Sequence, residues 1–161
     1  MSTDWTSFSL QIAVRATLQQ MYHAWTKPNE IEKWFLQSCT YLNNNSPIEK
    51  HENVNPKNTY EWTWFLYDIT EKGTVTIANN KDAIQFTFAG NCLVDVSLAQ
   101  KGDYVMVTLN QHEIPTDEKS KFNIHIGCLQ GWTFYFANLK SVYEGGLDLR
   151  NQIPELKGVN N

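Results

Sequence analysis

The chain has 161 residues and a formal net charge of −4; 42% of its residues are hydrophobic and 19% are charged. This length is sufficient for one domain with a substantial core, so we expect a single domain over residues 1–161. The acidic balance and the scattered Lys and Arg residues argue against a nucleic-acid-binding or anionic-membrane-binding surface. Neither a secretory signal nor an apolar run of membrane-spanning length is found, so we expect a cytoplasmic protein without membrane insertion.

The N-terminal part predicts one strand followed by two short helices. Apolar and polar residues alternate from Phe8 to Val14, which is typical of a half-buried strand. Thr17 is a suitable N-cap for a helix over residues 18–25. Pro28 is a suitable first residue for a second short helix that passes through Ile31 and reaches Trp34.

A long polar connection then separates this part from a series of predicted strands. Residues 35–42 predict a strand, and residues 43–58 are rich in Asn, Pro, Glu and Lys, which is typical of a surface loop with at most a short piece of strand. Tyr60, Trp62 and Trp64 alternate with smaller or polar residues, so we expect one strand to present three large rings on one face.

Four further strands follow, joined by short turns at residues 79–82, 90–91 and 101–103. Such short turns favour an antiparallel meander. Alternation predicts that each of these strands buries one apolar face, made by Val75, Ile77, Ile84, Phe86, Phe88, Cys92, Val94, Val96, Leu98, Val105, Val107 and Leu109.

The C-terminal part predicts one long helix. Within residues 119–150, a stripe with helical spacing is formed by Phe122, Ile126, Leu129, Trp132, Phe136, Leu139 and Tyr143. Gly145-Gly146 is expected to end the helix, because glycine readily adopts the left-handed backbone of a helix C-terminus. The order of elements predicts an α+β fold in which this helix covers one large antiparallel sheet.

A curved sheet around one helix leaves space between them unless side chains fill it. The aromatic content is high, at 13%, and these rings either fill the space or line it; we favour a cavity. The residues expected to line it are Trp62, Trp64, Phe86, Phe88, Val107, Leu129, Trp132 and Phe136. The expected ligand is a small hydrophobic molecule of the lipid, sterol-like or aromatic type.

Several local patterns match this layout to a known family. Ala24–Phe35, the Val107–Leu109 strand, Gly131-Trp132, Leu139-Lys140 and Glu144-Gly145 stand where that family has its characteristic residues. With them the chain resembles the START-like (SRPBCC) superfamily and, within it, the family related to the activator of heat-shock-protein-90 ATPase, in its single-domain bacterial type. The resemblance covers nearly the whole chain and implies the helix-grip fold.

The resemblance also implies two functions. The superfamily is known mainly for holding hydrophobic compounds in its cavity, so the first expectation is a non-catalytic binding protein. Members that activate the chaperone carry an additional N-terminal domain, for which this chain has no room. A protein-interaction module, with a chaperone or another protein as partner, is therefore the alternative. Fold alone does not decide between them.

Catalytic and metal-binding motifs are not found in the sequence. The four His residues lack metal-ligand spacing, Cys39, Cys92 and Cys128 form no C-x-x-C pair, and no nucleotide-binding or nucleophile motif occurs. We therefore expect neither a cofactor nor a metal and no enzyme. A cavity enzyme, cyclase-like or hydrolase-like, remains an alternative in which His112-Glu113 is an acid/base pair at the cavity mouth.

Four other charged residues are expected to have no role in a site. Asp95 and Glu61 lie on the outward side of their strands by alternation. Asp148 and Arg150 follow the predicted helix end and are expected to form a cap whose ion pair contributes little energy.

Overall fold

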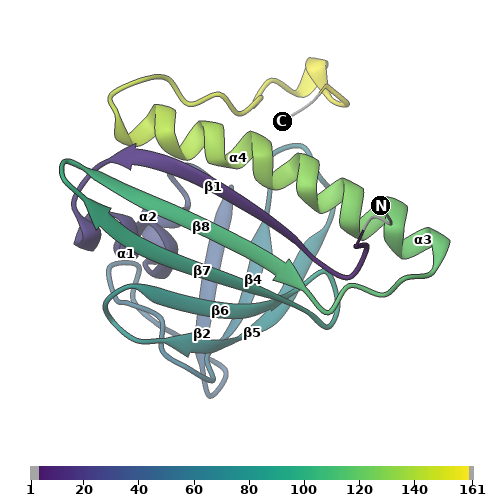
Figure 1. Ribbon diagram of the computed structural model, residues 1–161, viewed down its shortest axis with the longest axis horizontal. Helices are drawn as coiled ribbons and strands as arrows, with labels where there is room; N and C mark the ends of the chain where they lie inside the picture. Colours follow the sequence, from purple (N-terminus) through teal and green to yellow (C-terminus); the bar gives the residue numbers. More distant parts are fainter. Residues whose placement is uncertain (1–3, 160–161) are drawn as a thin grey trace.

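The main feature of the structure, a computed structural model that describes residues 4–159, is an eight-stranded antiparallel sheet. The order across the sheet is β1-β8-β7-β6-β5-β4-β2-β3. The strands are β1 Phe8–Arg15, β2 Ser38–Asn43, β3 Ser46–Pro47, β4 Thr59–Thr63, β5 Thr70–Ala78, β6 Ala83–Phe88, β7 Cys92–Lys101 and β8 Tyr104–His112. The sheet curves, and a long C-terminal helix runs along it beside β1 (Figure 1). The predicted α+β helix-grip architecture is confirmed.

The alternation of the sequence fixes which face of the sheet is buried. In β7 and β8 the inward side chains are buried as predicted, and Val96 lies opposite Leu109 in the ladder. The strand β1 closes the meander by pairing with β8 along its whole length, from Phe8↔Gln111 to Arg15↔Tyr104. The N-terminal strand is thus placed next to the last strand, where the C-terminal helix packs.

One inward position in β5 was predicted wrongly. Val75 is buried as expected, but the Ile77 side chain is 43% exposed. The ladder between β5 and β6 is irregular between these two residues, since Val75 pairs with Phe86 and Ile77 pairs with Gln85. Such a bulge changes the side of the sheet to which the following residues point, and here Ala78 takes the buried position.

Two short helices, α1 Leu18–Thr26 and α2 Pro28–Ile31, lie at one end of the sheet (Figure 1). The predicted N-cap of α1 is confirmed. The Thr17 hydroxyl accepts from the Gln20 backbone N–H, and the Gln20 side chain accepts from the Thr17 N–H. This reciprocal pair satisfies two N–H groups that a helix start otherwise leaves without partners. Pro28 begins α2 as predicted.

The C-terminal helix is continuous but not uniform. It consists of α3 Glu118–Ser120, a π-helical stretch η1 Lys121–Ile126 and α4 Gly127–Tyr143. Trp132, Phe136 and Leu139 are buried as predicted, whereas Phe122 is 71% exposed. A π-helical turn contains more residues than an α-helical turn, so the predicted stripe shifts around the helix before α4 and Phe122 leaves the buried face.

The predicted helix end is confirmed at the two glycines. Gly145 has a φ of +82°, and the N–H of Gly146 donates to the Ser141 carbonyl over 2.7 Å. After this turn the chain runs back along the outer side of α4, where it forms the short 3-10 helix η2 Pro154–Leu156 (Figure 1). Within residues 4–159, no helix is long and apolar enough to span a membrane.

Candidate functional site

The candidate site is an apolar pocket beside the N-terminal half of α4. Its volume is about 210 Å³. It is lined by Phe35, Trp64, Tyr67, Ile69, Phe88, Asn123, Gly127, Cys128, Gly131, Trp132 and Tyr135. These residues come from the turn after α2, the segment after β4, the end of β6, η1 and α4. None of them carries a formal charge at neutral pH.

Aromatic rings form most of the wall. The Phe35 ring stacks on Trp132 with centroids 4.9 Å apart and meets Trp64 edge-on at 5.5 Å. Phe88 lies 5.2 Å from Trp132 on the side of the sheet. Rings that touch one another in this way hold their positions, because offset and edge-to-face pairs are attractive beyond the area they bury. These rings therefore give the pocket rigid, flat walls.

Two glycines in the first half of α4 leave the space that the pocket occupies. A Cβ atom added at Gly131 would meet no atom within 4 Å, and at Gly127 only the Phe122 carbonyl, at 3.8 Å. Glycine inside a helix costs about 0.5–1 kcal/mol relative to alanine. Both glycines line the pocket. The helix is less stable because of them, but it has an open surface at the pocket.

The residues predicted to line a cavity are divided among three environments. Three of them, Trp64, Phe88 and Trp132, line the pocket. Leu129 is half-buried and lines a neighbouring hollow that shares Tyr67, Gly127 and Gly131 with the pocket. The other four pack in the core away from the pocket, each no more than 3% exposed: Trp62, Phe86, Val107 and Phe136.

The rings of the core thus fill most of the space between the sheet and the helix. Trp62 stacks on Tyr60 with centroids 3.8 Å apart and meets Phe86 at 5.2 Å. Trp132 continues this packing from the helix, 6.5 Å from Phe86. The expected cavity is therefore reduced to a pocket at one end of the core.

The orientation of Trp132 depends on a residue that the sequence reasoning missed. Its indole N–H donates to the side-chain carbonyl of Gln111 over 3.0 Å, and Gln111 is completely buried. The alternation in β8 places residue 111 on the inward face with Val107 and Leu109, and this is the signal that could have identified it. A polar residue at an inward position indicates a specific hydrogen bond.

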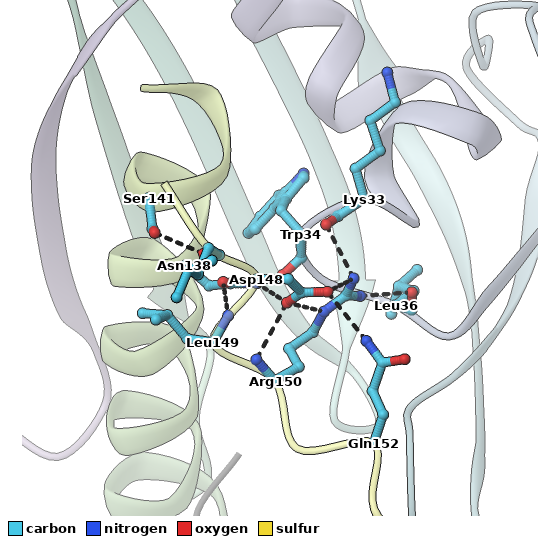
Figure 2. A network of polar contacts seen from close by, with 10 residues as sticks. Lys33, Trp34, Leu36, Asn138, Ser141, Asp148, Leu149, Arg150 and Gln152 are labelled. Atoms are coloured by element: carbon cyan, nitrogen blue, oxygen red, sulfur yellow. Dashed lines mark hydrogen bonds and ion pairs between the residues drawn. The ribbon is translucent and has the colours of Figure 1, made fainter. Parts of the chain in front are cut away.

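The turn that carries Phe35 is part of the network of hydrogen bonds and ion pairs in Figure 2. The Arg150 guanidinium donates to the backbone carbonyls of Leu36, over 2.8 Å, and Lys33, over 2.9 Å. The Asn138 amide donates to the carbonyl of Trp34 over 2.7 Å. These three carbonyls surround Phe35 in the sequence, so the network holds the turn that carries its ring.

This arrangement corrects the prediction for the segment after the helix. The Arg150 side chain is only 5% exposed and forms an ion pair with Asp148 at 2.7 Å. Its guanidinium also lies over the Phe65 ring, at 5.2 Å. Asp148 and Arg150 thus do not cap the helix end; they bind the C-terminal segment to the turn after α2.

Two lining groups that can ionise are held neutral by burial. Burial raises the pKa of the Cys128 thiol to about 11. Burial also raises the pKa of the Tyr135 hydroxyl, and the nearby Tyr67 adds to the shift. A thiol of this kind is a poor nucleophile, because the thiolate is the reactive form.

The proposed acid/base pair does not line the pocket. His112 ends β8 on the outer face of the sheet, where its Nε2 lies 2.8 Å from Asp95 Oδ2 and its Nδ1 lies 3.7 Å from Glu113. Asp95 also accepts from the Gln85 amide over 2.6 Å. In the part of the chain that the structure describes, no group of three or more His, Cys, Asp or Glu residues is arranged to hold a metal ion.

Solved structures with the same fold come from several bacteria. A protein from Staphylococcus saprophyticus is 16% identical, with a TM-score of 0.68 over 89% of this chain and 96% of its own. A protein from Nitrosomonas europaea is 11% identical, with a TM-score of 0.69 over 89% and 97%. At these identities the likeness shows the fold alone.

A third match carries a family name. The structure described as the Aha1 dimer from Colwellia psychrerythraea is 15% identical, with a TM-score of 0.67 over 87% of this chain and 97% of its own. A comparison with curated proteins gives no match. The family model described as "Activator of Hsp90 ATPase homolog 1-like protein" matches residues 15–144. Since that match spans most of the chain, the protein belongs to the family of Activator of Hsp90 ATPase homolog 1-like proteins.

Proposed function

We propose that this protein binds a small apolar ligand in the ring-lined pocket, without catalysing its conversion. The observation that carries the proposal is the composition of the pocket, whose eleven lining residues include six aromatic rings and no charged side chain. Ligand sites are typically concave and mostly apolar, with few polar groups. An exposed apolar hollow of this kind is also costly in water unless a ligand covers it.

The size of the pocket favours a compact ligand over a long lipid or a complete sterol. An enclosed apolar cavity of about 150 Å³ holds one benzene ring, and this pocket measures about 210 Å³. A ligand with two fused rings therefore matches the volume. The six aromatic rings that line the pocket favour an aromatic or other flat molecule.

Filling the pocket at Gly131 tests the proposal. The Gly131→Leu variant introduces a good helix former, and a Cβ atom at this position meets no atom within 4 Å. We expect it to lower the affinity for indane, a compact two-ring hydrocarbon, about tenfold or more. Affinity is measured by NMR titration, following the indole N–H signal of Trp132.

The matched control is Ala137→Leu, which adds the same side chain to an exposed position of the same helix. It is expected to bind indane with wild-type affinity. The proposal fails if the wild-type protein does not bind indane or related two-ring compounds, or if Gly131→Leu binds them as well as wild type does.

A second candidate function is supported by the family name alone. The family description names an activator of the Hsp90 ATPase, so an action on that chaperone is the alternative. The purified protein would be added to an Hsp90 ATPase assay at increasing concentration. A rise in ATP turnover that Gly131→Leu retains would favour a protein-interaction surface over the pocket.

A further inference from the structure

Tyr135 is a tyrosine with little exposed surface in the wall of the pocket. It lies in α4, four residues after Gly131, and only 8% of it is exposed. Its ring meets Phe35 edge-on with centroids 4.9 Å apart, and its side chain lines the pocket. Within residues 4–159, no hydrogen bond to its hydroxyl is present. Among the described residues, the fully buried polar atoms without a partner are the indole nitrogens of Trp25 and Trp62 and the amide nitrogen of Gln111. The Tyr135 hydroxyl is not one of them, so it keeps contact with open space.

The other tyrosines with little exposure behave differently. Each of four others has a hydrogen-bonded hydroxyl: that of Tyr22 accepts from Asn80, and those of Tyr41, Tyr60 and Tyr143 donate to Trp25, Thr87 and Glu30. Buried polar groups in folded proteins nearly always have partners. Among these five tyrosines, Tyr135 alone has a hydroxyl without a protein partner in residues 4–159, and its place in the pocket wall makes that hydroxyl available to a ligand atom.

We propose that the Tyr135 hydroxyl donates a hydrogen bond to an uncharged acceptor oxygen, such as a carbonyl, on a flat two-ring ligand in the pocket. The inference rests on the proposed function, because it concerns the same pocket, and it names the chemical class of the ligand. The rings bind the apolar part of such a ligand, and Tyr135 selects compounds with an acceptor at one edge.

The surroundings of Tyr135 favour a neutral acceptor over a carboxylate. No side chain with a positive charge lines the pocket, so an ionised ligand would lose its hydration without gaining a partner charge. The Arg150 guanidinium, whose charge influences the Tyr135 hydroxyl, is occupied by Asp148 and by the carbonyls of Leu36 and Lys33. The raised pKa of Tyr135 keeps its proton available for donation.

A matched pair of compounds and a matched pair of variants test the inference. Indan-1-one and indane have the same two rings and differ in one carbonyl group. We expect Tyr135→Phe to weaken the binding of indan-1-one about three- to tenfold, the range for loss of one net hydrogen bond, and to change the binding of indane less than about twofold. The control Tyr104→Phe removes a hydroxyl from an exposed ring on β8 and is expected to change neither affinity.

Each outcome has a definite meaning in this design. Equal weakening of both compounds by Tyr135→Phe would show that the ring packs but the hydroxyl does not recognise the ligand. An affinity of Tyr135→Phe for indan-1-one equal to that of wild type would also overturn the inference. In that case, binding of indane by the wild-type protein would still support the proposed function. If the wild-type protein binds neither compound, both the proposed function and this inference are wrong. Binding of indane-1-carboxylate as tight as that of indan-1-one would contradict the preference for a neutral ligand.

Discussion

At the scale of single residues, the two arginines of the chain differ sharply in their surroundings. The Arg15 side chain is 66% exposed and pairs with an equally exposed Asp103 at 3.3 Å. The Arg150 side chain is 5% exposed, and its donors contact two backbone carbonyls and Asp148. An exposed pair contributes little because water screens it, whereas a buried guanidinium with satisfied donors fixes the groups around it.

The first prediction compares the same substitution at these two sites. Arg150→Gln is expected to lower the free energy of unfolding by about 3 kcal/mol, because it removes the guanidinium donors to the Leu36 and Lys33 carbonyls and the charge partner of Asp148. Arg15→Gln is expected to lower it by less than about 1 kcal/mol. Urea unfolding followed by tryptophan fluorescence measures both values. Equal losses in the two variants would contradict the importance assigned to the network around Arg150.

Sequence patterns identify buried residues more easily than the partners of those residues. Alternation correctly placed Trp62 and Val107 inside, and it contained the signal for Gln111. It did not indicate that Arg150 reaches the turn after α2, because residues far apart in the chain meet there. The role proposed for Tyr135 depends on a hydroxyl without a protein partner in residues 4–159, which only the three-dimensional arrangement reveals.

At the scale of elements, α4 has opposing requirements. Helix stability favours side chains with high helix propensity, whereas the pocket needs open helix surface at Gly127 and Gly131. The π-helical stretch before α4 brings Asn123 to the pocket and turns Phe122 outward. Both features are typical of a helix whose local stability is reduced where a site is formed.

The second prediction contrasts two glycines with different neighbours. Gly131→Ala is expected to raise the free energy of unfolding by about 0.5–1 kcal/mol, because it removes a helix-interior glycine and its Cβ meets no atom within 4 Å. Gly73→Ala, in β5, is expected to lower it by about 1–3 kcal/mol. Its Cβ would lie 2.5 Å from the Tyr60 hydroxyl. Thermal and urea unfolding measure the stability of both variants. A lower stability of Gly131→Ala than of wild type would contradict the open helix surface at Gly131.

The elements themselves were largely predictable from the sequence. The meander, the Thr17 cap and the glycine stop of the long helix follow from local rules and are confirmed. The errors at Ile77 and Phe122 have a common cause: a bulge in a strand and a π-helical turn each change the periodicity by which side chains were assigned to a face. Such irregularities arise from tertiary packing, and a strict period of 2.0 or 3.6 does not predict them.

At the scale of the whole molecule, the pocket is the product of the fold. Its walls come from the turn after α2, the segment after β4, the end of β6 and the C-terminal helix, which meet only when the sheet curves around the helix. The sequence predicted the architecture and the identity of several rings. It did not predict how completely the core would be filled, because that depends on how ring volumes match the space between the sheet and the helix.

The stability of the whole molecule is also expected to depend on acidity. Several carboxyl groups have pKa values below their usual range. Hydrogen bonds from Lys140 and from the Arg15 backbone lower the pKa of Glu144. Burial raises the pKa of Asp148, but its hydrogen bonds with Arg150 and Asn138 outweigh burial, so the net shift is downward.

The third prediction follows from the sign of these shifts. A carboxyl group with a lowered pKa in the folded state binds protons more readily when unfolded, so its contribution is present above its unfolded pKa and is lost as the pH falls through the folded value. The free energy of unfolding should therefore decrease as the pH falls below about 4.5, the ordinary value for Glu. Urea unfolding at pH values from about 6 to about 2.5 measures this slope. Asp148→Asn should be less stable at pH 6 and show a shallower decrease, because it lacks one of the contributing carboxylates. A wild-type urea midpoint that stays constant over this range would show that these ionised contacts do not contribute to folding.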